Sequence, residues 1–220
     1  TNPIFENVKI HNNESGTTSG GGGMQADQAV TLKNVVIRDN EGDQYGGAYL
    51  NASSTLKDVQ IYKNRAKGGY SSADSGGIII SGPGANGTFE NVIVHNNTCA
   101  SCSAQGIYFD FADVTLVNVL VYGHASGPSL HLSGSEVQLV NSTMIGQPGN
   151  SLVSYSFSPT LHVYNSILWG DFSAGTADEV EIGYSIVKGS GGSGAWNDEF
   201  GTNDGGNLDD DPKFFNPDDG

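Results

Sequence analysis

One short pattern recurs eight times along the 220-residue chain and constrains its fold more than any other feature. An apolar residue and any second residue precede Asn, and apolar residues follow at alternating positions, as in 5–10, 89–94 and 116–121. Successive copies start 27, 24, 33, 27, 23, 24 and 19 residues apart. Self-similarity at intervals of about 20 to 50 residues is typical of solenoids and other stacked repeats.

Each repeat has the alternation of a β-strand, because Val8 and Ile10 flank Lys9 and predict an inward apolar pair with an outward polar residue. A second apolar segment precedes each motif, often after Gly-Gly as at 46–50 and 76–80. Two or three short strands per repeat predict an all-β fold, a parallel β-helix of about eight coils. We assign 1–190 to this solenoid and 191–220 to an irregular Gly- and Asp-rich tail, a candidate cap or docking segment.

An antiparallel barrel or sandwich is the competing interpretation. It would need hairpin signals at fixed offsets. The main candidate, Asn86-Gly87, falls between two strands of one predicted coil.

Stacked coils place equivalent residues above one another at about 4.8 Å. The recurring polar position therefore predicts a ladder of side-chain hydrogen bonds at one turn, where Asn also tolerates left-handed backbone. We expect Asn141 to be buried in this ladder, and Tyr184 to interrupt it in an irregular last coil. The predicted ladder comprises Asn7, Asn34, Asp58, Asn91, Asn118, Asn141 and Asn165.

Composition limits the partners. Glycine accounts for 32 residues, and 9 basic against 24 acidic residues give a formal net charge of −15. So few bases argue against nucleic acid, anionic membranes and polyuronate substrates, all of which need clustered Lys and Arg. No apolar run approaches the roughly 18 residues of a membrane span. We therefore expect no nucleic-acid partner and no direct membrane insertion.

Two sets of motifs resemble known repeats. The Gly-Gly-apolar segments at 46–48 and 76–78 and the Phe-Glu-Asn-Val segments at 5–8 and 89–92 resemble polymorphic outer-membrane adhesins. The segments 165–170, 184–187 and 206–215, in that order, resemble the C-terminal region of secreted bacterial right-handed β-helix repeat proteins that carry a downstream sorting or anchoring domain. The resemblance implies a right-handed coil and a secreted, cell-surface location more firmly than an activity, since such families include adhesins and carbohydrate-active enzymes.

The chain begins inside a repeat and stops shortly after the Asp-Pro segment, which indicates a piece of a longer solenoid or a processed subunit. Open coil ends expose unpaired strand edges and apolar core. Head-to-tail stacking would cover them, and such contacts produce filaments when they do not close. We therefore expect self-association into a polymer, with other surface proteins or glycans as alternative partners.

Catalytic candidates are sparse. Polysaccharide cleavage needs paired carboxylates, or a metal-bound base with Arg or Lys. His124 lacks such partners, and we expect it to replace an exposed Asn of the other coils. Asp110 and Asp113 could form a carboxylate pair, or simply a polar turn. The Asn residues that correspond to His124 in the other coils are Asn40, Asn64 and Asn97. No catalytic residue is predicted.

Calcium is the cofactor that the acidic loops could accommodate, because hard cations prefer oxygen ligands. One candidate cluster surrounds Gly42 and another lies in the tail; solvated acidic loops are the alternative for both. The candidate ligands are Asp39, Glu41, Asp43, Asp204, Asp209 and Asp211.

A cysteine pair and a pair of tyrosines are two further candidate features. Cys99 and Cys102 lie in a loop insert and predict a local disulfide, with free thiols as the alternative. Tyr49 and Tyr108 occupy equivalent places and could share an outward aromatic stripe that binds sugars or packs neighbouring fibres. His131 is expected to point outward.

We therefore expect a non-enzymatic, extracellular structural or adhesive β-helix protein, which could stack head-to-tail into a surface fibre. The alternative classes are a carbohydrate-binding module and a β-helix polysaccharide lyase or hydrolase.

Overall fold

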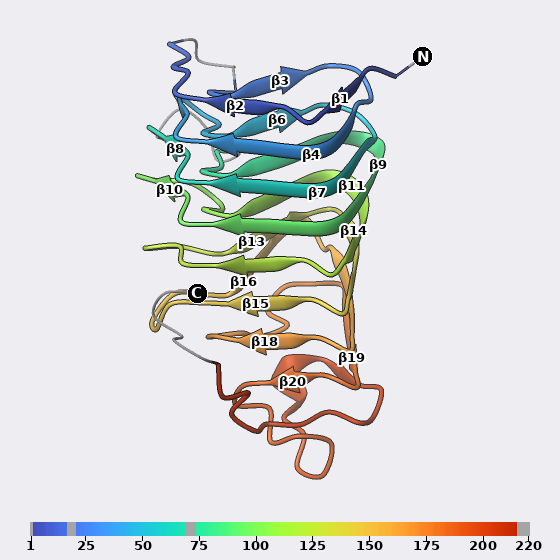
Figure 1. Cartoon of the computed structure of the whole chain (residues 1–220). Helices are drawn as coiled ribbons and strands as arrows, with labels where there is room; N and C mark the ends of the chain where they lie inside the picture. Colours follow the sequence, from blue (N-terminus) through green and yellow to red (C-terminus); the bar gives the residue numbers. More distant parts are fainter. Residues whose placement is uncertain (1, 17–20, 69–73, 215–220) are drawn as a thin grey trace.

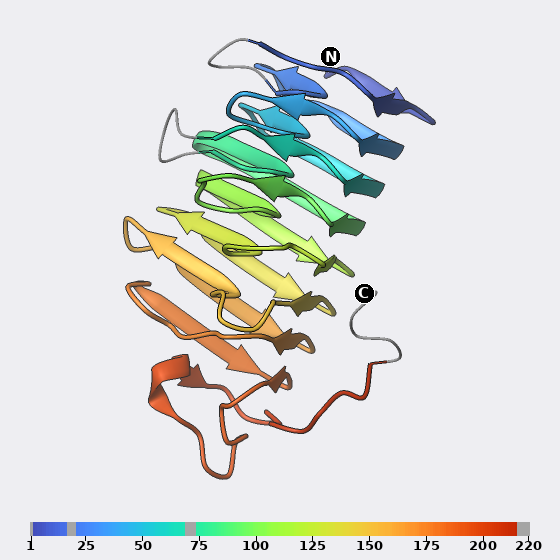
Figure 2. The ribbon, with the colours of Figure 1, turned by 90° about the vertical axis from the view of Figure 1, so that its left-hand side faces the viewer.

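The chain winds into coils that stack as successive layers from its N-terminal to its C-terminal end (Figures 1 and 2). This computed structural model describes residues 2–16, 21–68 and 74–214. Every strand pair in these ranges is parallel. Among the described residues the single helix is the short 3-10 helix η1 (Asp198–Phe200). The predicted all-β parallel β-helix is thus confirmed.

Each full coil has three sides, and in Figure 1 the third faces the viewer while the first lies behind it. The first side is formed by β3 (Met24–Ala26), β6 (Ala48–Leu50), β9 (Ile78–His95), β11 (Ile107–Val117), β13 (Leu130–Ser133) and β16 (Val153–Ser156). The second side contains β1 (Ile4–Glu6), β4 (Thr31–Arg38), β7 (Ser54–Tyr62), β9, β11, β14 (Glu136–Val140), β17 (Thr160–Tyr164), β19 (Glu179–Gly183) and β21 (Thr202–Asn203).

The third side contains β2 (Lys9–His11), β4, β7, β9, β12 (Leu120–Tyr122), β15 (Thr143–Ile145), β18 (Ile167–Trp169) and β20 (Ile186–Val187). Some strands bend through a corner: β4, β7 and β9 belong to the second and third sides, and β9 and β11 to the first and second. A short extra sheet beside the loops consists of β5 (Glu41–Gly42), β8 (Arg65–Ala66) and β10 (Thr98–Cys99).

Inward side chains of the three sides form one apolar core along the axis. Leu32, Leu56 and Phe89 stand in register in successive coils, and each is fully buried. Phe89 also packs edge-on against Phe109, with ring centroids 5.7 Å apart. Full burial of a side chain of this size contributes about 1.5–3 kcal/mol, so the stacked apolar rows are the main source of stability.

The Gly-Gly pairs enter the first side where neighbouring coils approach most closely. A Cβ on Gly77 would overlap the carbonyl oxygen of Gly106 in the next coil and lie 3.0 Å from the side-chain nitrogen of Asn97. Any larger residue would push the coils apart. Close packing therefore explains the glycine at this position.

Buried polar residues carry hydrogen bonds from coil to coil at the corner between the second and third sides. In the last coils the residue after the corner is Ser, and its Oγ accepts a backbone N–H of the preceding coil. Ser142 accepts from Val119 at 2.9 Å, Ser166 from Ser142 at 3.0 Å and Ser185 from Ser166 at 3.1 Å. Asn207 extends this series by accepting the N–H of Ser185 at 3.0 Å. We call it the serine ladder.

The stacking continues beyond residue 190, where the sequence predicts an irregular tail. Strand β21 pairs with β19, and Leu208 forms a bridge with Ile186. Phe200 of η1 is buried, and its ring lies 5.9 Å from that of Phe172. The segment therefore covers the end of the core. Within the described part of the chain, no helix has the length and apolarity that crossing a membrane would need.

Candidate binding site

The predicted polar ladder lies on the outside of the corner between the second and third sides. All seven of its residues have left-handed backbone, with φ between 49° and 58°. Side-chain hydrogen bonds join Asn34 to Asn7 at 2.7 Å, Asn91 to Asp58 at 2.9 Å and Asn118 to Asn91 at 3.2 Å.

At this corner the expectation that Asn141 is buried is wrong, and so is the irregular course of the chain that was expected at Tyr184. Asn141 is exposed rather than buried, because a left-handed residue here directs its side chain away from the core. Tyr184 keeps the same left-handed backbone, with φ 53°, and its N–H donates to the Gly205 carbonyl at 2.8 Å. The coil therefore passes the corner regularly at this position.

A second asparagine series is buried beside the Gly-Gly pairs. The Asn40 amide donates to Asn64 Oδ1 at 2.9 Å, and the Asn64 amide donates to Asn97 Oδ1 at 3.0 Å. Each of the three amides also donates to a backbone carbonyl of the preceding coil. We expected these residues to be exposed, but they are at most 1% accessible. We call this series, including Asn13 at its N-terminal end, the inner asparagine ladder.

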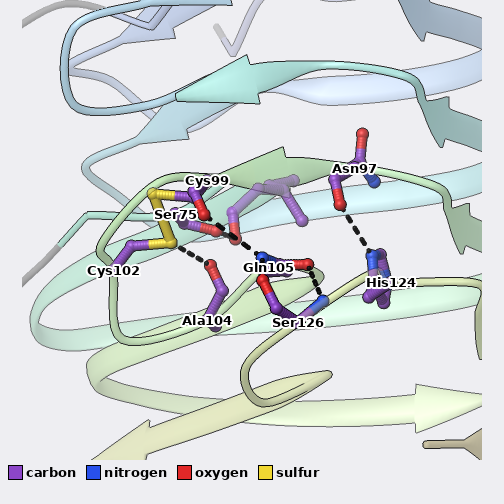
Figure 3. The surroundings of a disulfide bond; sticks show 9 residues. Ser75, Asn97, Cys99, Cys102, Ala104, Gln105, His124 and Ser126 are labelled. Atoms are coloured by element: carbon purple, nitrogen blue, oxygen red, sulfur yellow. Dashed lines mark hydrogen bonds between the residues drawn. A yellow bond between two sulfur atoms is a disulfide. The ribbon is translucent and has the colours of Figure 1, made fainter. Parts of the chain in front are cut away.

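His124 follows the inner asparagine ladder in the next coil, and it too is buried instead of exposed. Its Nδ1 lies 3.2 Å from the Asn97 carbonyl oxygen (Figure 3), and its Nε2 has no hydrogen-bond partner. Burial lowers the pKa of His124 to about 4. The ring is therefore neutral at ordinary pH and serves the packing of the coil.

The first predicted calcium cluster surrounds a lysine. The Lys67 ammonium lies 3.2 Å from Glu14, 3.3 Å from Glu41 and 3.4 Å from Asp43. Asp39 pairs with its neighbour Arg38 instead. Hydrogen bonds to these carboxylates, that to Glu14 foremost, raise the pKa of Lys67 well above its usual range. The lysine thus takes the place that we expected a cation to fill.

The second predicted cluster is spread along the tail. Asp209 accepts the N–H groups of Gly189 and Gly191 at 2.7 and 3.0 Å, and Asp211 binds Lys213 at 3.1 Å. Hydrogen bonds from Lys213 lower the pKa of Asp211. Across residues 2–16, 21–68 and 74–214, no three His, Cys, Asp or Glu side chains gather in a group that could hold a metal ion. Asp204, Asp209 and Asp211 are therefore not gathered into one cluster in the described part of the chain.

Cys99 and Cys102 are joined by a disulfide, with Cα atoms 5.9 Å apart (Figure 3). Gln105 fixes this loop to the next coil, because its amide nitrogen donates to the Cys99 carbonyl at 3.2 Å and to Ser126 Oγ at 2.7 Å. Its amide oxygen accepts the Ser126 N–H at 3.0 Å. These bonds hold two neighbouring loops together.

The predicted tyrosine stripe is only partly accessible. Tyr49 and Tyr108 stand in one outward row of the first side, in register with Ile79 between them. Tyr45 stacks on Tyr49, with centroids 4.5 Å apart, and Tyr108 is buried. These rings form a small apolar cluster with Ile79 and Ala104. One face of the Tyr49 ring is therefore covered by Tyr45, and the Tyr108 ring is not accessible to a ligand.

Two other aromatic rings are free, at the corner between the first and second sides. Phe111 is 43% and Phe157 74% exposed, and their ring centroids are 5.7 Å apart. They lie two coils apart on either side of Gly134, and a Cβ on Gly134 would meet the Phe111 ring at 2.6 Å. The small residue in the middle coil therefore lets the two rings meet.

Both phenylalanines have left-handed backbone, with φ 51° and 55°. This conformation is unfavourable for a bulky residue, and such residues cluster at binding and active sites. Exposed apolar rings also have no role in the core. The pair is therefore the strongest sign of a ligand site on the described surface. We call Asp110, Phe111, Gly134, Ser156 and Phe157 the phenylalanine corner.

Hydrogen-bonding groups border the two rings. The Asp110 carboxylate accepts the hydroxyl of Ser81 at 3.0 Å and that of Tyr108 at 3.4 Å. Burial raises the pKa of Tyr108 to about 12, so its hydroxyl remains a donor. Asp110 and Asp113 flank Phe111 but are engaged separately, since Asp113 accepts the N–H of Glu136 at 3.3 Å. The two carboxylates thus have separate hydrogen-bond partners.

His131 connects two serines next to the pair. It lies on the outer row of the first side, although it is only 9% exposed. Its Nδ1 is 2.6 Å from Ser154 Oγ and its Nε2 is 3.0 Å from Ser156 Oγ. Burial lowers the pKa of His131 to about 4. A neutral ring donates through one nitrogen and accepts through the other, so one serine keeps its proton for another acceptor.

A serine beside a histidine could also suggest a nucleophile. That chemistry needs a base that can hold the proton and a group that stabilises the imidazolium. Here the second ring nitrogen faces a serine hydroxyl, and burial disfavours the charged ring more than the Asp110 carboxylate favours it. The arrangement is suited to orienting a hydroxylated ligand rather than to activating Ser156.

Two open hollows lie on the same part of the solenoid, although no residue of the phenylalanine corner lines either of them. One of about 390 Å³ is lined by residues 51–53 and 82–85 of the two coils before Phe111, at the same corner. The other, of about 270 Å³, lies on the second side between Asn86, Asp113 and Glu136.

The phenylalanine corner could not be recognised from the repeat. Neither ring belongs to the recurring Asn motif or to a Gly-Gly segment, and their meeting depends on Gly134 in another coil. The available signal is an apolar residue at a predicted turn, Phe111 between Asp110 and Ala112. The contact between the two rings follows from the stacking of the coils and not from the linear sequence.

The chain belongs to the right-handed β-helix family, because the family model described as a right-handed beta helix region matches residues 1–144. The comparisons with curated proteins and with solved structures found no match. Membership of the family gives the hand of the coil and the class of fold. The function must be argued from the surface.

Proposed function

We propose that this β-helix is a non-enzymatic, extracellular adhesive protein that binds glycans at the phenylalanine corner. The observation that carries the proposal is the exposed pair Phe111 and Phe157, which have left-handed backbone and lie next to polar side chains. The C–H face of a sugar ring packs on an exposed aromatic ring, and its hydroxyls bond to neighbouring polar groups. Asp110 and Ser156 are placed to supply such groups.

The charge of the site favours uncharged glycans. The phenylalanine corner contains one carboxylate and no Lys or Arg, and Asp113 and Glu136 lie beside it. The whole chain carries a formal charge of −15. Uronate-rich or sulfated polymers would be repelled, because like charges without a basic partner raise the free energy of association.

An extracellular location has independent support. The Cys99–Cys102 disulfide is compatible with an oxidising compartment, where such bonds persist. The motif resemblance to secreted and surface β-helix repeats points the same way. A rigid solenoid that displays a lateral ligand site would act as an adhesin, in which the coils serve as a spacer.

A panel of neutral and anionic glycans tests the proposal, followed by affinity electrophoresis with the polymers that bind. The variants are Phe111→Ala and Phe157→Ala, and the matched control is Tyr184→Ala, since Tyr184 is an exposed aromatic with left-handed backbone at a different corner. An aromatic contact is worth about 0.5–1.5 kcal/mol beyond its buried area, so each Phe variant should weaken binding about threefold to tenfold. Failure of every neutral glycan to bind, or equal binding by all variants, would refute the proposal.

A further inference from the structure

The third side differs in charge from the second side, whose outward rows include Glu6, Glu90 and Glu181. Two outward rows run along it, and neither contains an Asp or Glu although the chain has 24 acids. One row consists of Lys9, Val36, Gln60, Ile93, Leu120, Thr143, Ile167 and Ile186. The other consists of His11, Arg38, Tyr62, His95, Tyr122, Ile145, Trp169 and Lys188. We call these sixteen residues the acid-free face.

The acid-free face carries apolar residues at many outward positions. Ile93, Leu120 and Ile167 are half-buried on its surface, where the alternation of a solvated strand would place polar residues. The rings of Tyr62, His95 and Tyr122 stack along the axis, with successive centroids 4.8 Å apart. Their faces are used in this stack, so only the ring edges point outward. The surface therefore offers apolar side chains rather than platforms for sugar rings.

The geometry points to a second copy of this chain as the partner: we propose that two molecules pair laterally through their acid-free faces. A chain with a charge of −15 repels its copies, and two copies that meet through their acid-free faces bring no carboxylates of these rows into opposition. Two flat β-surfaces pack face to face at about 10 Å, with their side chains interleaved. Rows of equal spacing on both copies fit this arrangement.

The size of the face sets the strength of the pairing. Eight strands at about 4.8 Å give a length of about 34 Å, and with side chains the width is about 15 Å. The resulting area in plan, about 500 Å², is below the roughly 800 Å² per partner of a standard interface. The pairing should therefore be reversible and depend on concentration. It rests on a different surface from the phenylalanine corner, which lies at the corner between the first and second sides.

Sedimentation equilibrium over a wide range of concentration tests the pairing, with Leu120→Glu as the variant. The control is Thr115→Glu, which places the same charge on the second side of the same coil. The wild type and the control should show a monomer–dimer equilibrium, and Leu120→Glu should weaken it at least about tenfold. Circular dichroism checks that each variant is folded.

A mixture distinguishes lateral pairing from other modes of association. Leu120→Lys alone should also be monomeric, whereas an equal mixture of the Glu and Lys variants should regain the dimer, because a mixed pair brings opposite charges together in one interface. A wild-type monomer at every concentration would overturn the proposal. A monomer–dimer equilibrium that is unchanged in Leu120→Glu would overturn it equally, since it would show that the two copies pair through another surface.

Discussion

Replacing His124 by Asn should make the fold resistant to mild acid. His124 occupies the place that Asn40, Asn64 and Asn97 take in earlier coils, but its Nε2 is buried without a partner. The side-chain oxygen of an Asn at this position could accept a hydrogen bond from the amide nitrogen of Asn97. Asn97 Oδ1 accepts the same hydrogen bond from the Asn64 amide nitrogen. The substitution would thus extend the inner asparagine ladder by one coil and remove a buried group that titrates.

The pKa of His124 determines the magnitude. Its value in the folded chain is about 4, below the roughly 6.5 of an unfolded chain. Well above pH 6.5 neither state is protonated at this ring, so the full stability is present. As the pH falls from 6.5 to 4, the unfolded chain takes up the proton first, and stability is lost. A difference of 2.5 pKa units corresponds to about 3 kcal/mol.

Urea unfolding followed by circular dichroism at several values between pH 7 and pH 4 gives the measurement. His124→Asn should lose about 3 kcal/mol less stability than the wild type over this range. Part of the acid sensitivity should remain, because His131 also has a lowered pKa and stays in place. His11→Asn, at an exposed strand end, is the control. Equal loss of stability in the wild type and His124→Asn would refute the reasoning.

Three further substitutions test the packing of the coils. Gly77→Ala should destabilise by several kcal/mol, because its Cβ would overlap the carbonyl oxygen of Gly106, while Gly194→Ala, where a Cβ meets nothing within 4 Å, should change the melting temperature little. Lys67→Met should lower the melting temperature at low ionic strength and much less at high salt. The lost ammonium lies between three carboxylates near the surface, and without it these carboxylates repel one another until salt screens them. Ser166→Ala should cost about 1–3 kcal/mol in urea unfolding, because it leaves a buried backbone N–H of the preceding coil without an acceptor; a cost near zero would show that the serine ladder contributes little.

The repeat pattern was sufficient to predict the architecture. Alternation within each motif fixed the inward rows, and the spacing of the Asn motifs fixed how coils superpose, as Leu32 over Leu56 illustrates. Orientation of the polar residues was harder. Two asparagine series have the same period, yet Asn141 is exposed and Asn64 buried, because left-handed backbone at the corner reverses the direction of the side chain.

The surface features depended on contacts that no linear pattern encodes. Lys67 reaches Glu14 across 53 positions of sequence, which converts a predicted cation site into an ion-pair cluster. Phe111 and Phe157 meet only because Gly134 separates them. Such pairings follow from the register of non-adjacent coils, and a single sequence does not specify that register to within one residue at a corner.

The inner asparagine ladder also has a consequence for the length of the molecule. Each amide bonds only to the coils directly before and after it, and every coil that carries Asn40, Asn64 or Asn97 presents the same groups on both faces. A duplicated coil inserted among them would find all its hydrogen-bond partners already in place. The solenoid can therefore grow from its middle by whole coils of about 4.8 Å each, which changes the reach of a surface protein without altering either end.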